Sequence, residues 1–409
     1  PMAYADLYLA LQQGVIDEDD RNLESPSPIQ AEALAALEAT RADGRDAGLV
    51  VMATGLGKTW LAAFDSTRPA FRRVLFIAHR EEILRQARDV FRRVRPDATA
   101  GLFVGEERTP HTDVVFASIQ SLTGHLHEFA RDEFDYVVVD EFHHASAPTY
   151  RTAIDHFVPK FLLGLTATPD RMDGADLLAL CGDNRVFECG LTEAIDRSEL
   201  VPFRYWGVPD VVDFAPIPWR NGRFDPEALD HAVITEARAE HAIREWQSRK
   251  GTRTLAFCAS TRHADFMAEQ FRQRGIAAVA VHSKQETSAP RRLAIEQLAE
   301  GTLEVICSVD VFNEGLDVPA VDTVLMLRPT ASPIIFLQQL GRGLRRYDGK
   351  DHLRVIDFIG NHRCFLSKPR ILLSLGSGRE ATFADAIEAA RSGVFELPAD
   401  CLVDYDLEA

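Results

Sequence analysis

The stretch "GLVVMATGLGKTWLAAF" (residues 48–64) decides the fold of this chain. Residues 48–53 form a short apolar run typical of a buried strand, and the residues after Thr59 form a helical pattern. Gly55 and Gly57 lie between them, directly before Lys58. Glycines let the backbone approach an anion closely, and the N-terminus of a helix favours negative charge. A strand, a glycine-rich turn and a helix in this order therefore predict a phosphate-binding loop.

The loop itself supplies the predicted nucleotide contacts. We expect Lys58 to reach the β- and γ-phosphates and the Thr59 hydroxyl to hold Mg²⁺. Met52 stands where the strict pattern has glycine, so the prediction depends on the strand and helix around the loop. The expected nucleotide-binding residues here are Thr54, Gly55, Leu56, Gly57, Lys58 and Thr59.

A second stretch, "YVVVDEFHHAS" (136–146), ends an apolar run with two acids and two histidines. A phosphate loop requires an acid at the end of a neighbouring strand to hold Mg²⁺, and Asp140 fits that role. Glu141 then orients or deprotonates the attacking water. The alternative is a zinc cluster that includes His143 and His144. Adjacent side chains on an extended segment point apart, so we expect no zinc and a Mg²⁺ requirement, with His143 coupling the nucleotide site to another part of the protein.

Apolar runs alternate with helical patterns along most of the chain, which predicts an α/β fold with parallel sheets. The pattern pauses at 170–250 and then resumes, so we expect two α/β domains in tandem with their boundary near 200–205. The predicted strands are 48–53, 74–78, 113–118, 136–140, 161–166, 253–260, 277–283, 303–309, 322–328 and 353–359. The expected organisation is an acidic extension (1–24), domain 1 (25–202), domain 2 (203–370) and an acidic, possibly truncated tail (371–409) with one helix near 382–391.

Composition limits the class of protein. Hydrophobic content of 46% is ordinary for a globular chain, and no apolar run is long enough to span a membrane. Six scattered cysteines without a CxxC pair indicate a reducing compartment, for which we expect the bacterial cytoplasm. The net charge of −17 is unusual for a nucleic-acid binder, but the two termini carry much of it. Residues 72–95 contain eight arginines and three acids, which suits either a solvated helix face or a phosphate-facing surface.

Further segments, in order along the chain, resemble the DExH-box helicases of superfamily 2, in the branch related to restriction-enzyme motor subunits. The resemblance runs from about Gln30 to about Asp357. The strings are also similar to the helicase segment of bacterial fusions that carry a phospholipase-D-like nuclease. The segments that carry it are "SPIQAEAL" (27–34), "AHREEI" (78–83), "ASIQSLTG" (117–124), "DEFH" (140–143), "LTATP" (165–169), "FCAST" (257–261), "DVFNEGLDVP" (310–319) and "QQLGRGLRR" (338–346).

This resemblance implies two RecA-like domains with an ATP cleft between them. Gln30 would read adenine, Gly315 and Asp317 would line the nucleotide site, and Gln338, Arg342 and Arg345 would act on the γ-phosphate from the second domain. The arginine that often stacks on adenine is missing before Gln30, and Val309 stands where relatives often have a hydroxyl. The implied nucleic-acid contacts are His79, Arg80, Ser118, Gln120, Thr123, Gly124, Ser260 and Ser308.

Three functions remain open at this point. The first is an ATP-dependent helicase, with DNA favoured over RNA by the family branch. The second is a translocase that moves on duplex DNA without separating it, and the third is an ATPase switch that needs no nucleic acid. We also expect further domains or subunits to act together with this chain. The aromatic residues considered as a base-stacking pin are Phe203, Tyr205, Trp206 and Trp219, although core packing is the more common role of such residues.

Overall fold

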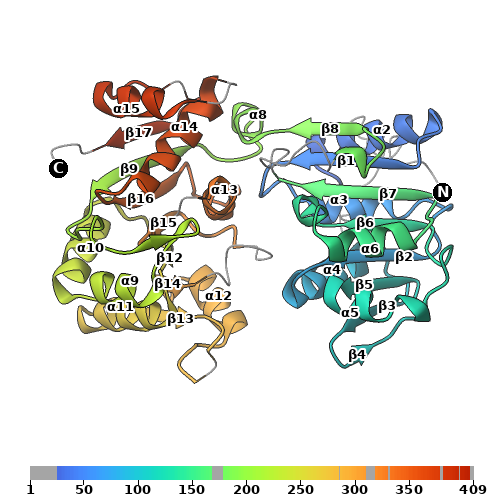
Figure 1. The fold of residues 1–409 in the computed structure, drawn as a ribbon, viewed down its shortest axis with the longest axis horizontal. Coiled ribbons are helices and arrows are strands. Elements are labelled where there is room, and N and C mark those ends of the chain that lie inside the picture. Colours follow the sequence, from blue (N-terminus) through green and yellow to red (C-terminus); the bar gives the residue numbers. More distant parts are fainter. Residues whose placement is uncertain are drawn as a thin grey trace. The chain divides into compact units, whose positions relative to one another are not determined.

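The structure is a computed structural model that describes residues 25–167, 178–284, 286–309, 318–329, 332–377, 381–395 and 397–405. The chain divides into two compact units, Pro1–Gly190 (unit 1) and Leu191–Ala409 (unit 2). Each unit contains one parallel or mainly parallel β-sheet with helices on its faces (Figure 1). The α/β fold in two tandem units is confirmed.

Unit 1 is built on a sheet with strand order β4-β3-β5-β2-β6-β7-β1-β8, in which only β4 pairs antiparallel. The strands are β1 (Ala47–Met52), β2 (Val74–Ala78), β3 (Ala100–Val104), β4 (Glu107–Arg108), β5 (Val114–Ser118), β6 (Tyr136–Val139), β7 (Phe161–Thr166) and β8 (Arg185–Cys189). The central strands are buried along their whole length, as expected for a parallel sheet covered on both faces. The five predicted strands of this half are confirmed, and β3, β4 and β8 were not predicted.

The helices of unit 1 are α2 (Pro28–Ala42), α3 (Lys58–Asp65), α4 (Glu81–Val94), α5 (Ile119–Gly124) and α6 (Pro148–His156), with the 3₁₀ turns η2 (Leu126–Glu128) and η3 (Phe142–His144). Helix α3 is anchored at its last residue. Asp65 is fully buried, accepts two hydrogen bonds from Arg41 on α2 and accepts a third, 2.8 Å long, from the Tyr136 hydroxyl. This network holds the helix behind the predicted phosphate loop against β6.

The arginine-rich segment 72–95 contributes mainly an amphipathic helix. Helix α4 buries Ile83, Leu84, Ala87 and Phe91. Arg85 on its outer side pairs with Glu81 and Glu107, at 2.6 and 2.8 Å. A solvated helix face with local ion pairs therefore accounts for this part of the segment.

Unit 2 contains a wholly parallel sheet in the order β13-β14-β12-β15-β16-β9-β17 and a separate two-stranded hairpin. The strands are β9 (Phe203–Pro209), β12 (Thr254–Phe257), β13 (Ala278–Val281), β14 (Val305–Ser308), β15 (Thr323–Met326), β16 (Leu353–Ile359) and β17 (Leu402–Tyr405), and the hairpin is β10 (Trp219–Arg220) with β11 (Arg223–Phe224). The helices are α8 (Leu191–Asp196), α9 (Pro226–Val233), α10 (Glu236–Arg249), α11 (Thr261–Gln273), α12 (Arg291–Glu300), α13 (Pro333–Arg342), η4 (Arg363–Leu366), α14 (Ser367–Ser377) and α15 (Phe383–Ser392).

Unit 2 begins earlier in the chain than predicted, and its sheet includes part of the predicted tail. Residues before the expected boundary pack onto it, because the Thr192 hydroxyl donates to the Leu375 carbonyl at 2.6 Å and Leu200 forms an antiparallel bridge with Arg345. After the predicted helix, found here as α15, the chain returns and adds β17 beside β9. The segment expected as an acidic tail is therefore partly an edge of the sheet.

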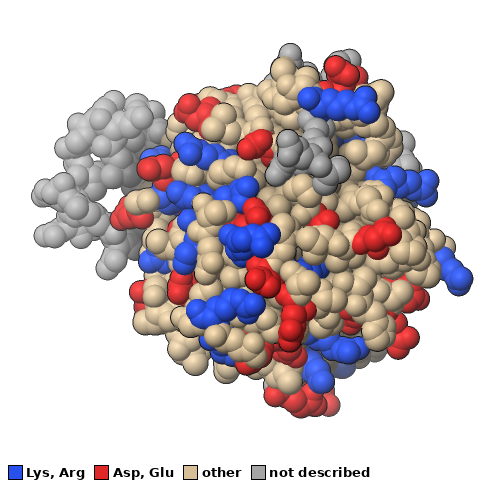
Figure 2. Space-filling model, turned by 90° about the vertical axis from the view of Figure 1, so that its left-hand side faces the viewer, with Lys and Arg blue, Asp and Glu red and all other residues tan. Residues whose placement is uncertain are grey.

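No helix among the described ranges has the length and apolarity that a membrane span requires. Figure 2 shows the face of unit 2 that lies at the left of Figure 1. Acidic and basic side chains alternate over this face instead of gathering into one basic stripe. Such a mixed surface is typical of a solvated protein face, so nucleic-acid contacts are better sought at the carboxyl ends of the strands.

Candidate functional site

The loop between β1 and α3 has the backbone that its glycines predict. Gly55 and Gly57 both have positive φ values, 104° and 78°, a region that residues with a side chain rarely adopt. Gly57 is also the N-cap residue of α3, so Lys58 and Thr59 begin the helix. The Lys58 ammonium donates to the Met52 carbonyl at 3.2 Å and thus folds back over the loop. The loop, the helix N-terminus and Lys58 together form a cradle suited to phosphate.

Gln30 holds this loop from α2. Its side-chain amide donates to the carbonyl oxygens of Leu56 and Gly57, at 3.1 and 3.2 Å. Its Oε1 accepts from the Ser27 N–H at 2.9 Å, and Ser27 in turn caps α2. A Cβ at Gly57 would lie 2.4 Å from the Gln30 amide nitrogen, so this contact also requires glycine in the loop. In this structure Gln30 supports the loop, and its predicted role as an adenine reader stays a prediction.

Replacing Gln30 with alanine tests the support directly. We expect the KM for ATP to rise roughly tenfold, because two hydrogen bonds of about 0.5–1.5 kcal/mol each are lost. Steady-state hydrolysis of ATP and of GTP would be measured on the parent and on Gln30→Ala, with the exposed Gln273→Ala as the matched control. A pure loop support predicts equal losses for the two nucleotides, whereas an adenine reader predicts a loss for ATP alone. An unchanged KM for both nucleotides would contradict either role.

The acidic side of the site lies after β6, which is separated from β1 by β7 alone. Asp140 is buried, and its Oδ1 accepts the N–H of Glu141 at 3.0 Å. Burial raises the pKa of Asp140 to about 6, the Glu141 carboxylate adds to this, and Lys58 and His143 oppose it. Lys58, Asp140, Glu141 and His143 therefore form one electrostatic group. Carboxylate oxygen, such as that of Asp140, is a hard donor that suits Mg²⁺.

Glu141 adopts an unusual backbone conformation, with φ at 49°, immediately before η3. Strained backbone at a functional residue persists only when the surroundings enforce it. Here the Glu141 Oε2 lies 3.3 Å from His143 Nδ1, and the same nitrogen lies 3.5 Å from the Thr166 hydroxyl at the end of β7. His143 thus lies between the acidic segment and the start of "LTATP", and its coupling role stays a prediction. Thr168 and Pro169 lie outside the described residues.

Three histidine rings continue this connection toward β2. The rings of His143 and His144 have centroids 4.3 Å apart, and those of His144 and His79 are 4.8 Å apart. Arg80 then donates from Nε to His79 Nε2 at 3.2 Å. The adjacent histidines are therefore members of a side-chain row. Within the described parts of the chain, no group of three His, Cys, Asp or Glu residues is arranged to hold a metal ion.

The predicted nucleic-acid contacts of unit 1 lie at the carboxyl ends of the neighbouring strands β5 and β2. Arg80 and His79 are half-buried, Gln120 and Gly124 are exposed, and Thr123 is half-buried. Ser118 is mostly buried, and its hydroxyl accepts the Ser121 N–H to cap α5. Because all these strands are parallel, this group and the phosphate cradle occupy the same edge of one sheet.

The predicted residues of unit 2 are less uniform in exposure. Arg342 ends α13 and Arg345 follows it, and both are half-buried. Gln338 on the same helix is 2% exposed, and its Nε2 has no hydrogen-bond partner among the described residues. The Arg345 carbonyl accepts from the Lys350 ammonium at 2.8 Å, which steadies the turn after α13.

The other four candidates of unit 2 differ in burial, and two of them are not described. Ser260 is the half-buried N-cap of α11, and Ser308 is fully buried at the end of β14. The Ser308 hydroxyl therefore does not face solvent in this structure. Gly315 and Asp317 lie outside the described residues.

Of the four aromatic residues considered as a base-stacking pin, three belong to the core of unit 2. Phe203 and Tyr205 are buried in β9, and Trp206 packs against the hydrophobic cluster that includes Val208, Ile356 and Phe358. Trp219 lies on the β10–β11 hairpin at the rim of a cavity. The Asn-Gly pair in "WRNGRF" (219–224) is the sequence signal of such a hairpin, and it was missed.

Comparisons with known proteins support the arrangement. Residues 24–171 match the family described as type III restriction enzyme, res subunit, and residues 237–347 match the helicase conserved C-terminal domain. The Schizosaccharomyces pombe protein irc3, whose name describes a mitochondrial ATP-dependent helicase, is 30% identical over 352 residues. That alignment covers 82% of this chain and 57% of the yeast protein, so the chain spans little more than half of this relative.

Two solved structures share the fold. The ATP-dependent type ISP restriction-modification enzyme LlaBIII, solved with DNA, has a TM-score of 0.64 at 16% identity, covering 94% of this chain and 32% of that one. Saccharomyces cerevisiae Dbp5, solved with RNA and ADP·BeF₃, has a TM-score of 0.63 at 16% identity, covering 93% of this chain and 90% of that one. The ordered segments, the two sheets and these matches lead to one conclusion: residues 24–171 belong to the res-subunit family of restriction enzymes and residues 237–347 to the helicase conserved C-terminal domain, and the chain as a whole is similar to the superfamily 2 ATP-dependent helicases.

Proposed function

We propose that this chain is an ATP-driven motor that moves along DNA, with ATP hydrolysed between the phosphate cradle of unit 1 and the arginines of unit 2. The observation that carries the proposal lies within unit 1. Lys58, Asp140 and Glu141 form one electrostatic group, and a row of histidines connects that group to Arg80 at the same edge of the sheet. Such a row gives strand binding a physical route to the residues that hydrolyse ATP.

The chemistry follows from the positions of these groups. Lys58 and the loop N–H groups bind the phosphates, and Glu141 holds the attacking water and accepts its proton. His143, close to both Glu141 and Thr166, positions the carboxylate. Mg²⁺, when bound by Asp140 and Thr59, neutralises phosphate charge. Arg342 and Arg345 neutralise the remaining negative charge on the γ-phosphate. Hydrolysis is therefore conditional on the approach of unit 2.

DNA is the proposed track because of the restriction-enzyme branch. Residues 24–171 match the res-subunit family, and LlaBIII, which shares the fold, was solved with DNA. Dbp5 has a similar fold and was solved with RNA, so the fold alone does not distinguish a DNA track from an RNA track. Duplex translocation without strand separation and a nucleic-acid-independent switch are the alternative functions.

The setting and the wider architecture are also proposals. All six cysteines are buried thiols that form no disulfide, which suits a reducing compartment such as the bacterial cytoplasm. The likeness to the helicase segment of phospholipase-D-nuclease fusions rests on the sequence strings, and a nuclease partner would add a cutting step to the motor.

One experiment separates the functions. ATPase turnover would be measured with no nucleic acid, with single-stranded DNA, with duplex DNA and with RNA of the same length. We expect the largest stimulation with DNA. Stimulation by RNA alone would replace the proposed track, and equal rates in all four conditions would favour the switch. A strand-displacement assay on a partial duplex then distinguishes a helicase from a duplex translocase.

Substitution of Arg80 tests the predicted contacts with the DNA strand. We expect Arg80→Ala to require several-fold more DNA for half-maximal ATPase stimulation, because one phosphate contact is lost. The slope of log Kd against log salt should fall by about one, and the loss should be independent of base sequence. Arg85→Ala is the matched control, since Arg85 lies on the same helix and pairs with Glu81 and Glu107. An unchanged salt slope in Arg80→Ala would remove Arg80 from the track.

A further inference from the structure

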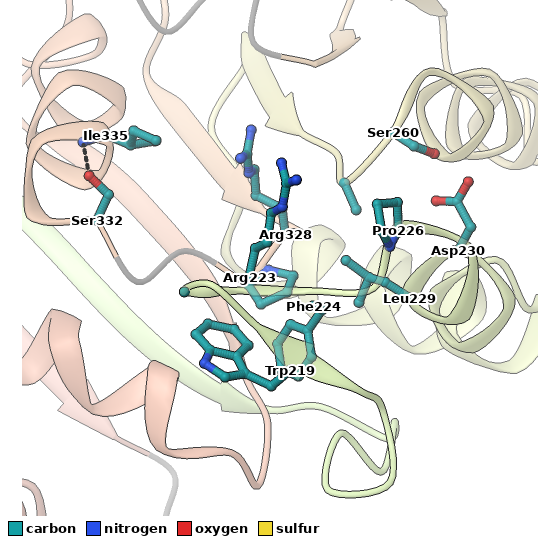
Figure 3. A pocket seen from close by; sticks show the side chains of 13 residues that line it. Trp219, Arg223, Phe224, Pro226, Leu229, Asp230, Ser260, Arg328, Ser332 and Ile335 are labelled. Atoms are coloured by element: carbon teal, nitrogen blue, oxygen red, sulfur yellow. Dashed lines mark hydrogen bonds between the residues drawn. The ribbon is translucent and has the colours of Figure 1, made fainter.

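Unit 2 contains a cavity of about 300 Å³, and of the motif segments only "FCAST" contributes to its lining (Figure 3). Ala259 and Ser260, which follow β12, line one side of it, and Arg328 and Pro329, which follow β15, line another. These strands are neighbours, but the chain leaves β12 toward β13 on one side of the sheet and leaves β15 toward β16 on the other. Ligands of open α/β sheets bind where the connections diverge in this way, at the carboxyl ends of the strands.

The β10–β11 hairpin supplies an aromatic wall. Asn221 and Gly222 join the strands with positive φ values of 50° and 75°, which suits a tight hairpin turn. Trp219 pairs across the hairpin with Phe224, and their ring centroids are 4.7 Å apart. Phe224 is buried against Phe214, so the hairpin has its own small core. This support leaves the half-buried Trp219 ring fixed at the rim of the cavity.

The cavity is positively charged on one side. Arg223 and Arg328 both line it (Figure 3). Two helices also begin there, α11 after Ser260 and α13 after Ser332, and helix N-termini favour negative charge. The N-terminus of α13 lies far from the proposed catalytic residue Arg342, because α13 spans 10 residues, or roughly 15 Å, between Ser332 and Arg342. The cavity is thus suited to an anion other than the γ-phosphate.

An acidic side chain also lines the cavity. Asp230 on α9 lines the cavity near Ser260, away from Trp219 (Figure 3). The aromatic wall and the positive side together decide the class of ligand. A simple phosphate has no flat face for the Trp219 ring, whereas a nucleotide carries a flat base as well as a phosphate.

We propose that this cavity binds one nucleotide of the strand on which the motor moves. The base lies against Trp219, and its phosphate meets Arg223 and Arg328. The proposal rests on the proposed nucleic-acid function and adds a base contact to a track otherwise expected to touch backbone. A free mononucleotide shares this chemistry. The strand is the preferred source because Arg223 is exposed at the rim, where the next phosphate of a strand would pass.

A double-mutant cycle, with one change in the protein and one in the DNA, tests the base contact. Binding would be measured by fluorescence anisotropy with two labelled single-stranded oligonucleotides of equal length, one of normal deoxynucleotides and one of abasic deoxyribose units. We expect Trp219→Ala to bind the normal strand about tenfold more weakly, the usual scale of one base–aromatic stack. The same variant should bind the abasic strand as the parent does, because no base remains to be lost. Trp219→Phe should restore most of the affinity.

The matched control is Arg220→Ala, since Arg220 is exposed on the same hairpin and does not line the cavity. It should bind both strands like the parent, and all variants should unfold at the parent's temperature. Equal weakening of both strands in Trp219→Ala, or no weakening of either, would overturn the pocket while the parent still binds DNA. A parent that binds neither strand would refute the motor proposal as well. Loss of free deoxynucleoside monophosphate binding in Trp219→Ala, with normal strand binding, would identify a mononucleotide site and overturn the strand proposal.

Discussion

Glu141→Gln binds ATP as the parent does and hydrolyses it about 10²- to 10⁴-fold more slowly; this is the result we expect, on the scale of a lost general base. The amide keeps the size and the hydrogen-bonding reach of the carboxylate, but it cannot accept a proton from water. The Met52 carbonyl still accepts from Lys58, and Gln30 still donates to the loop carbonyls, in this variant. We therefore expect the variant to accumulate in an ATP-bound, closed state with high affinity for DNA.

Two measurements separate binding from chemistry in this variant. Equilibrium titration with a fluorescent ATP analogue gives the affinity, and rapid-quench single turnover gives the rate of hydrolysis. Lys58→Ala is the comparator that should lose affinity itself, because the phosphate cradle loses its cation. Glu128→Gln, an isosteric change at an exposed residue on η2, is the control. Turnover of Glu141→Gln at the parent rate would remove Glu141 from the role of water-positioning base.

The sheet strands were predictable where they are buried on both faces. Continuous apolar runs such as 74–78 and 161–166 have no polar alternation, and each lies within a parallel sheet as expected. Strand β3 was missed because Gly101 interrupts its pattern, yet that glycine is required, since a Cβ there would lie 2.4 Å from the Thr109 carbonyl. Strand β17 was missed for a different reason. It pairs with β9, almost two hundred residues away, and such non-local pairing leaves no local pattern in the sequence.

The candidate site also has a part that the sequence predicts and a part that it does not. Lys58 and Asp140 follow strands in a local order that chemistry dictates, so the residues themselves predicted their neighbourhood. The support of the phosphate loop by Gln30 was not predictable, because it depends on how α2 packs against the loop. Neither was the histidine row, since His79 and His144 come from different strand ends that meet only in the folded sheet. Spacing along the chain identifies the reacting groups, whereas the contacts that position them come from tertiary packing.

Arg345→Ala is expected to lower ATP turnover about 10³-fold or more, the usual contribution of an arginine supplied from a second domain. ATP affinity should change little, because the phosphate cradle belongs to unit 1. Arg342→Ala should behave similarly. Arg345→Lys should recover only part of the rate, since a lysine provides one point charge in place of a planar guanidinium with paired donors.

Arg346 makes a stringent control for this test. It is the next residue along the chain, it is exposed, and its guanidinium donates to the Ser198 carbonyl at 3.2 Å. Arg346→Ala should therefore hydrolyse ATP at nearly the parent rate, which separates the effect of one guanidinium from general disturbance of the turn after α13. Single-turnover hydrolysis with saturating DNA would be compared across the parent and the variants Arg342→Ala, Arg345→Ala and Arg346→Ala. Near-normal rates in both Arg342→Ala and Arg345→Ala would refute hydrolysis between the two units and would confine the chemistry to the cradle of unit 1.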